Sequence, residues 1–192
     1  MDFSSENLLA IARKYWRADK VYDGRLVNSP EYDRLCDLWE ERLRNDLERW
    51  TAFLEALRPE LPGFDLGSAT VPSSSSSFRC VAYARSPRQS PPFHFAVVGC
   101  VSILAPLYSV YGVQYDFVGP EQHNPRVSFE PLPPEMREPA DIIAQKIEAM
   151  FEVRRLPREV ADKPVPLFTP WKEPPETTLF DVLFDSQPDN LP

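Results

Sequence analysis

The chain has 192 residues, of which 43% are hydrophobic and 12% aromatic, enough for one folded domain with a sizeable core, so a disordered chain is excluded. The formal net charge of −8 disfavours direct binding to nucleic acid or to an anionic membrane surface, and it is compatible with a basic protein partner. The cysteines Cys36, Cys80 and Cys100 have no CxxC spacing, which argues against a zinc site or a disulfide framework and indicates a reduced, cytoplasmic protein.

The N-terminal part, residues 1–62, is predicted to be helical. It begins without the basic region and apolar run of a signal peptide, and residues 5–18 have apolar side chains at helical spacing. Ser29 followed by Pro30 is typical of a helix start, because serine can cap the first turn and proline fits the first helical position. A long helix is therefore expected over 30–58.

Apolar residues recur along this long helix at every third or fourth position: Tyr32, Cys36, Trp39, Leu43, Leu47, Trp50, Leu54 and Leu57. Such a stripe indicates one buried face, and packing of that face in the core is the simplest interpretation. Because the spacing is close to a 3.5-residue repeat, a homodimer through the helix 30–58 is the alternative.

The middle part, residues 63–132, is predicted to be an antiparallel sheet. Its most apolar stretch, residues 94–117, contains Pro106 and is rich in residues that favour strands, so we expect two paired strands here rather than a membrane helix. Short connections between successive strands favour an antiparallel meander. The expected strands are 64–71, 78–84, 93–104, 107–118 and 127–132.

The last part, residues 133–192, is predicted to contain a helix that opens at Glu138-Pro139, followed by a proline-rich extended segment. The end of the chain is apolar, and Thr177 or Thr178 could cap a single helical turn there. Docking of this tail on the body of the protein is expected, and binding of the tail to a partner is the alternative.

These elements predict a single α+β domain over residues 1–192. Its antiparallel sheet of four to five strands is packed on one face by two to three helices, and a proline-rich C-terminal tail wraps around it. The other face of the sheet is expected to be partly open and able to receive a partner.

Catalytic motifs are missing from the sequence, which contains no GxSxG, GxxxxGK[ST], GxGxxG or HExxH pattern. His94 and Cys100 fall on one strand about 20 Å apart, too far for a nucleophile and its base. We therefore expect no enzyme activity, no catalytic or metal-binding residues and no cofactor. The alternative is a small enzyme with a pocket on the open sheet face, near His94, Cys80 and Asp116.

The segments FHFAVVGCVSILAPLYSVYGVQYDF and IIAQKIEAMFEVRRLPREV lie in a stretch, roughly residues 80 to 185, that resembles immunity proteins of bacterial polymorphic toxin systems. The resemblance lies in the layout of the segments and not in a diagnostic motif, so no functional residue is transferred from it. It implies a cytoplasmic, non-enzymatic protein that binds and neutralises a cognate protein toxin without a cofactor.

Tyr108, Gln114 and Asp116 are the candidate partner-binding residues. They share one side of the strand 107–118, opposite a more apolar set: Tyr111, Val113, Tyr115 and Phe117. The more apolar set is expected to face the helices, which leaves the candidate residues toward the partner, where aromatic and acidic side chains are effective contacts. An ordinary sheet surface is the alternative interpretation.

Overall fold

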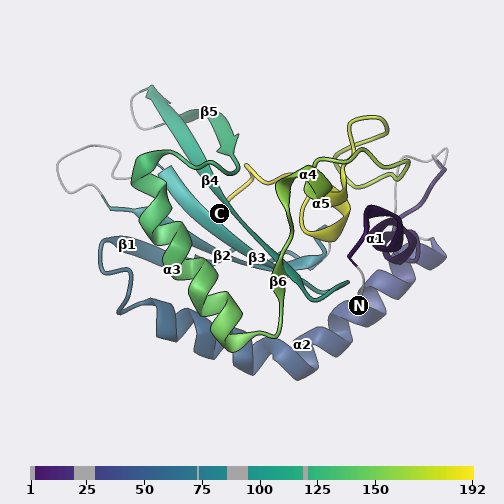
Figure 1. The fold of residues 1–192 in the computed structure, drawn as a ribbon, viewed down its shortest axis with the longest axis horizontal. Helices are drawn as coiled ribbons and strands as arrows, with labels where there is room; N and C mark the ends of the chain where they lie inside the picture. Colours follow the sequence, from purple (N-terminus) through teal and green to yellow (C-terminus); the bar gives the residue numbers. More distant parts are fainter. Residues whose placement is uncertain (1–2, 20–28, 73, 86–94, 119–120) are drawn as a thin grey trace.

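The computed structural model describes residues 3–19, 29–72, 74–85, 95–118 and 121–192. Its sheet is an antiparallel meander in chain order (Figure 1), which confirms the predicted α+β class. A short strand, β6, continues the sheet by pairing parallel to the start of β4. The strands are β1 (Phe64–Ser68), β2 (Ser77–Ala84), β3 (Phe95–Ser102), β4 (Leu107–Val118), β5 (Glu121–Ser128) and β6 (Arg154–Arg155).

Two helices, α2 (Pro30–Leu57) and α3 (Pro134–Met150), cover one face of the sheet (Figure 1). The predicted start of α2 is confirmed, since the backbone N–H of Tyr32 donates to Ser29 Oγ at 3.1 Å. Trp39 and Trp50 lie on the ring of Phe78 in β2, with centroid distances of 5.2 and 5.3 Å. The aromatic contacts fix α2 on the sheet.

The buried stripe of α2 differs from the predicted stripe at both ends. Leu35 and Phe53 are buried, where the spacing had pointed to Cys36 and Leu54, and Leu47 is 49% exposed. Apolar residues stand side by side at these positions, so the helical period alone does not decide which of them is buried.

Helix α3 begins at Pro134, earlier than the predicted opening at Glu138-Pro139, and it continues through Pro139. Pro134 takes the first helical position, where the backbone N–H that proline lacks would have no partner within the helix. Pro139 is buried against the core, and the helix continues past it although a proline normally ends or kinks a helix.

The predicted strand at 127–132 is displaced, because β5 ends at Ser128 and a bend follows.

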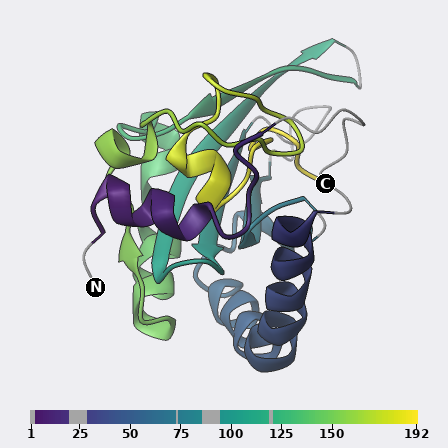
Figure 2. The same ribbon diagram turned by 90° about the vertical axis from the view of Figure 1, so that its right-hand side faces the viewer.

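The second face of the sheet is covered, contrary to the expectation of a partly open face. The helices α1 (Ser5–Ala12), α4 (Arg158–Ala161) and α5 (Leu179–Leu183) lie on this side, and Figure 2 shows α1 against α5. The carbonyl oxygen of Val182 accepts hydrogen bonds from Trp16 Nε1 at 2.7 Å and from Ser76 Oγ at 2.8 Å. The C-terminal segment, residues 179–192, therefore docks on its own chain.

Thr178 starts α5 with a reciprocal cap. Its backbone N–H donates to the Asp181 carboxylate at 2.8 Å, and its side chain accepts from the Asp181 backbone N–H at 3.4 Å. This confirms one of the two capping threonines predicted from the sequence. Among the described residues, no helix is both long and apolar enough to cross a membrane.

Replacement of Gly99 by alanine is expected to lower the free energy of unfolding by about 1–3 kcal/mol, as overpacked cores do. A Cβ atom at this position would lie 2.6 Å from Cγ2 of Ile143 in α3 and 3.0 Å from Sγ of Cys80. Gly67→Ala is the matched control, since its nearest neighbour is Val81 Cγ1 at 3.9 Å. Urea denaturation of both variants measures the difference, and equal losses would contradict the close packing of α3 on β3.

Candidate functional site

Tyr108 faces α3 and is only 1% exposed. Its hydroxyl donates to the Glu148 carboxylate, and the Arg155 guanidinium lies 5.6 Å from its ring centre. Burial, followed by the hydrogen bond to Glu148, raises the Tyr108 pKa to about 12. Its polar end therefore joins α3 to β6, and most of its ring is not available to a partner.

The more apolar side of β4 faces the C-terminal segment and not α2 and α3, so the predicted orientation of β4 was wrong. The Tyr111 hydroxyl donates to the carbonyl oxygen of Pro188 at 3.0 Å, and its ring meets the ring of Phe180 edge-on. Both faces of the sheet are buried. The alternation of residues along the strand therefore does not show which face packs on α2 and α3 and which packs on the C-terminal segment.

Gln114 and Asp116 lie further along β4 and make separate contacts. Gln114 Nε2 donates to Glu135 Oε1 in α3 at 3.3 Å, whereas Asp116 Oδ1 accepts from Arg126 in β5 at 2.7 Å. The pairing of β4 with β5 shifts register between Gln114 and Asp116. The structure thus places Tyr108 and Gln114 beside α3 and Asp116 beside β5, without one shared cluster.

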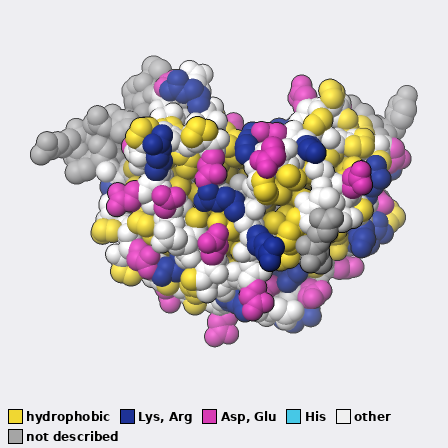
Figure 3. Space-filling model, in the orientation of Figure 1, with side chains coloured by type: hydrophobic (Ala, Val, Ile, Leu, Met, Phe, Trp, Pro, Cys, Tyr) yellow, Lys and Arg dark blue, Asp and Glu magenta, His cyan; other side chains and the backbone are white. Residues whose placement is uncertain are grey.

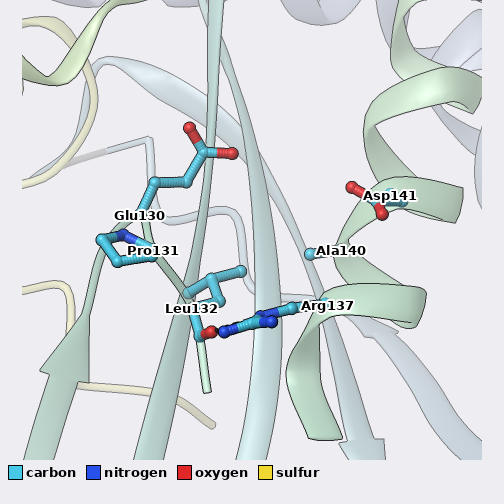
Figure 4. Close-up of a pocket in the computed structure, with 6 residues that line it drawn as sticks. All are labelled: Glu130, Pro131, Leu132, Arg137, Ala140 and Asp141. Atoms are coloured by element: carbon cyan, nitrogen blue, oxygen red, sulfur yellow. Dashed lines mark hydrogen bonds between the residues drawn. The ribbon is translucent and has the colours of Figure 1, made fainter. Parts of the chain in front are cut away.

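A hollow lies beside α3, and none of the three candidate residues lines it. It has a volume of about 480 Å³ and is bounded by the connection from β5 to α3 and by the first turns of α3 (Figure 4). We call it the α3 groove. Its lining residues are Glu130, Pro131, Leu132, Arg137, Ala140 and Asp141.

The α3 groove combines an apolar base with charged sides. Leu132 and Ala140 are buried and form the base, and Glu130 and Asp141 lie on opposite sides of the hollow (Figure 4). Arg137 Nε donates to the carbonyl oxygen of Leu132 at 2.8 Å, which holds the arginine along the groove. The groove can therefore accept a side chain that is apolar along its length and polar at its end.

Only one of the two carboxylates of the groove is paired with a positive charge among the described residues. Glu130 forms an ion pair with Arg155, whereas the Asp141 carboxylate has no ion pair or side-chain hydrogen bond with any residue that the structure describes. Over and beside α3, acidic and basic side chains are interspersed with hydrophobic ones (Figure 3). Asp141 is thus the open negative charge of the groove.

Two residues of the alternative enzyme site, Cys80 and Asp116, lie in different surroundings. Cys80 is fully buried in the core, whereas Asp116 is partly exposed and paired with Arg126. His94 lies outside the described residues. Burial raises the pKa of Cys80 to about 12 and holds the pKa of Cys100 far above its usual value, so both thiols stay protonated near neutral pH. Within the described ranges, no group of three or more His, Cys, Asp or Glu residues could hold a metal ion.

The thiols are expected to react with a thiol reagent in two phases at pH 8. The half-buried Cys36 reacts first, and Cys80 and Cys100 react only as the protein unfolds, because reaction requires an accessible thiolate. The measurement is the time course of modification by a chromogenic disulfide reagent, with a urea-unfolded sample as the control. Prompt reaction of all three cysteines in the native protein would contradict the burial of β2 and β3.

Sequence reasoning missed a buried ion pair between Arg79 in β2 and Asp185 in the C-terminal segment. These side chains are 3% and 5% exposed. Arg79 Nε also donates to the carbonyl oxygen of Ala69 at 2.9 Å. Burial raises the pKa of Asp185, although the Arg79 charge acts in the opposite direction. The available signals were an arginine in an apolar strand and an acid in an apolar tail.

The chemistry available in the α3 groove is recognition by shape and charge, since it offers an apolar base, the Arg137 guanidinium, one open carboxylate and a paired one. No family model matches the chain, and no curated protein or solved structure is significantly similar to it.

Proposed function

We propose that this chain is a protein-binding protein of the immunity type, which binds and neutralises a cognate protein toxin in the cytoplasm through the α3 groove. The observation that supports the proposal most is the open carboxylate of Asp141 above the apolar base formed by Leu132 and Ala140. A protein partner offers both kinds of group in one side chain, because lysine and arginine join an apolar stem to a charged end.

Charge supports the same kind of partner. The chain has a net charge of −8, so a basic protein is attracted over a distance before contact. Charge pairs at the edge of an interface mainly raise the association rate and select the partner. Binding of the toxin is therefore expected to weaken as the salt concentration rises.

Rigidity of the groove is the third support. The Glu130–Arg155 ion pair and the Tyr108–Glu148 hydrogen bond connect the segment after β5, β4, β6 and α3. A surface that is already in place loses less entropy on binding than a mobile one. The groove suits a binder that acts by covering its partner and needs no chemical step.

A homodimer through α2 is a second candidate interaction. Leu47 is 49% exposed on this helix, and Leu43 and Leu54 are only partly buried. These side chains could form a small apolar seam with a second copy. Sedimentation equilibrium of the purified protein distinguishes a monomer from a dimer.

The test of the proposed function is affinity capture of the tagged protein from its native host, first at low and then at high salt, with identification by mass spectrometry. One stoichiometric, basic, salt-sensitive partner is expected, and co-expression should protect cells from that partner's toxicity. Recovery of the protein alone, together with turnover of a small molecule in a substrate screen, would overturn the proposal and favour the enzyme.

A further inference from the structure

A second hollow is lined by residues of α2, of the turn between β3 and β4, and of the segment that follows α3. Figure 1 shows where these elements lie in the fold. The volume of the hollow is about 330 Å³. We call it the arginine hollow, because Arg42 and Arg49 of α2 both line it. It shares no lining residue with the α3 groove.

The guanidinium group of Arg42 is under-satisfied. Its two terminal nitrogens lie 3.3 Å from the Asp46 carboxylate and 3.4 Å from the carbonyl oxygen of Ile103. These distances exceed the roughly 2.7–2.9 Å of good charge-assisted hydrogen bonds. The Nε atom of Arg42 is buried and has no acceptor among the described residues. Buried donors without an acceptor are uncommon, so Arg42 keeps hydrogen-bonding capacity that its contacts within the chain do not use.

Arg49 supplies a second positive charge, and unlike Arg42 it has no acidic partner among the described residues. It lies two helical turns after Arg42 on the same side of α2. Its guanidinium is 5.8 Å from the ring centre of Phe151, and it forms no ion pair with any residue in the described part of the chain. A contact with a ring leaves the N–H donors at the edge of a guanidinium free for an anion.

The remaining lining of the arginine hollow is largely apolar. Phe78, Val101, Ile103 and Phe151 are all buried side chains that line it. The carboxylates of Asp46 and Glu152 also line it, and they would repel a multiply charged anion such as a phosphate group. A single negative charge on an apolar body meets both conditions.

We propose that the arginine hollow binds a carboxylate attached to a small apolar body. The planar guanidinium of arginine matches a carboxylate through paired N–H donors, and the apolar lining bounds the space left for the apolar body. A free hydrophobic acid and the C-terminal residue of a peptide share this chemistry. The site does not depend on the proposed toxin-binding function, because it uses different residues from those of the α3 groove.

The test is a titration of the isotope-labelled full-length protein with N-acetylphenylalanine, followed by nuclear magnetic resonance. Saturable shifts are expected at the backbone amides of residues 101–105 and 151–153. N-acetylphenylalaninamide, which lacks the carboxylate, should bind at least about tenfold more weakly, as expected for loss of a charge-assisted contact. Equal binding of the amide, or no saturable shift at these residues, would overturn the proposal.

Variants make the test specific to the two arginines. Arg49→Gln and Arg42→Gln should each weaken binding of N-acetylphenylalanine by about tenfold, while Arg44→Gln, an exposed α2 residue outside the hollow, should leave it unchanged. Circular dichroism checks that each variant is folded. An equal loss in Arg44→Gln and Arg49→Gln would assign the effect to general charge and overturn the site.

The source of the carboxylate is separated by two further probes, 3-phenylpropanoate and the peptide acetyl-Gly-Gly-Phe with a free C-terminus. Tighter binding of the peptide supports a peptide C-terminus as the natural occupant. Equal or tighter binding of 3-phenylpropanoate supports a free acid. Failure of both probes to bind would contradict the carboxylate site itself.

Discussion

Asp185→Asn is expected to lower the free energy of unfolding by about 3–5 kcal/mol, because it leaves the Arg79 guanidinium buried without its counter-charge. Asparagine keeps the size of aspartate, so the loss reports the charge and not a cavity. The measurement is urea denaturation followed by tryptophan fluorescence.

Two comparisons make the Asp185 result specific. Asp65→Asn removes the exposed ion pair with Arg85 and should cost less than about 1 kcal/mol. Joint replacement of Arg79 by methionine and Asp185 by leucine should recover much of the stability, since apolar residues can replace a buried pair without leaving a charge. A loss at Asp185 no larger than that at Asp65 would contradict the burial of the pair.

Phe184→Ala is expected to cost about 3–5 kcal/mol, as is usual when a buried aromatic side chain is truncated. Phe184 is fully buried, and its ring lies 5.3 Å from that of Phe180. Its carbonyl oxygen also accepts from the Ser77 hydroxyl at 3.1 Å, so the segment is fixed to β2 by its backbone as well. Urea denaturation gives the change in stability, and limited proteolysis should show earlier cleavage in the C-terminal segment.

Trp171→Ala is the control for Phe184, because Trp171 is 58% exposed in the same part of the chain. Its loss should change the free energy of unfolding by less than about 0.5 kcal/mol. If both variants were equally stable, the C-terminal segment would not be part of the folded core.

Local signals in the sequence were sufficient for much of the fold. The Ser29-Pro30 start, the break at Pro106 and the capping threonine before α5 each act within a few residues, and the structure has all of them. A residue pattern of this kind depends only on local backbone geometry and on side-chain contacts within a few residues. The antiparallel order of the strands followed from their short connections.

Contacts between distant segments could not be read from the sequence. Alternation in β2 separates Arg79 from Cys80, but it does not show that both faces are covered, one by α3 and the other by the C-terminal segment. The orientation of Tyr108 on β4 was wrong for the same reason. The cover of each face is decided by tertiary packing.

The α3 groove was also beyond sequence reasoning. Its residues come from the bend after β5 and from the first turns of α3, where a strand and a later helix start had been predicted. Asp141 stands in a region of mixed charge, and nothing in its spacing distinguishes it from a solvated surface acid. Only the tertiary packing places it across the groove from Glu130.

The most direct test of the proposed function is the dependence of partner capture on the α3 groove. Asp141→Lys should reduce the amount of the salt-sensitive partner recovered at low salt by about tenfold or more, because it reverses the open charge of the groove. Glu55→Lys makes the same charge change at an exposed position of α2 outside the groove and should leave recovery nearly unchanged. Recovery that neither variant reduces would contradict binding through the α3 groove. An equal loss in both variants would indicate that net charge alone attracts the partner.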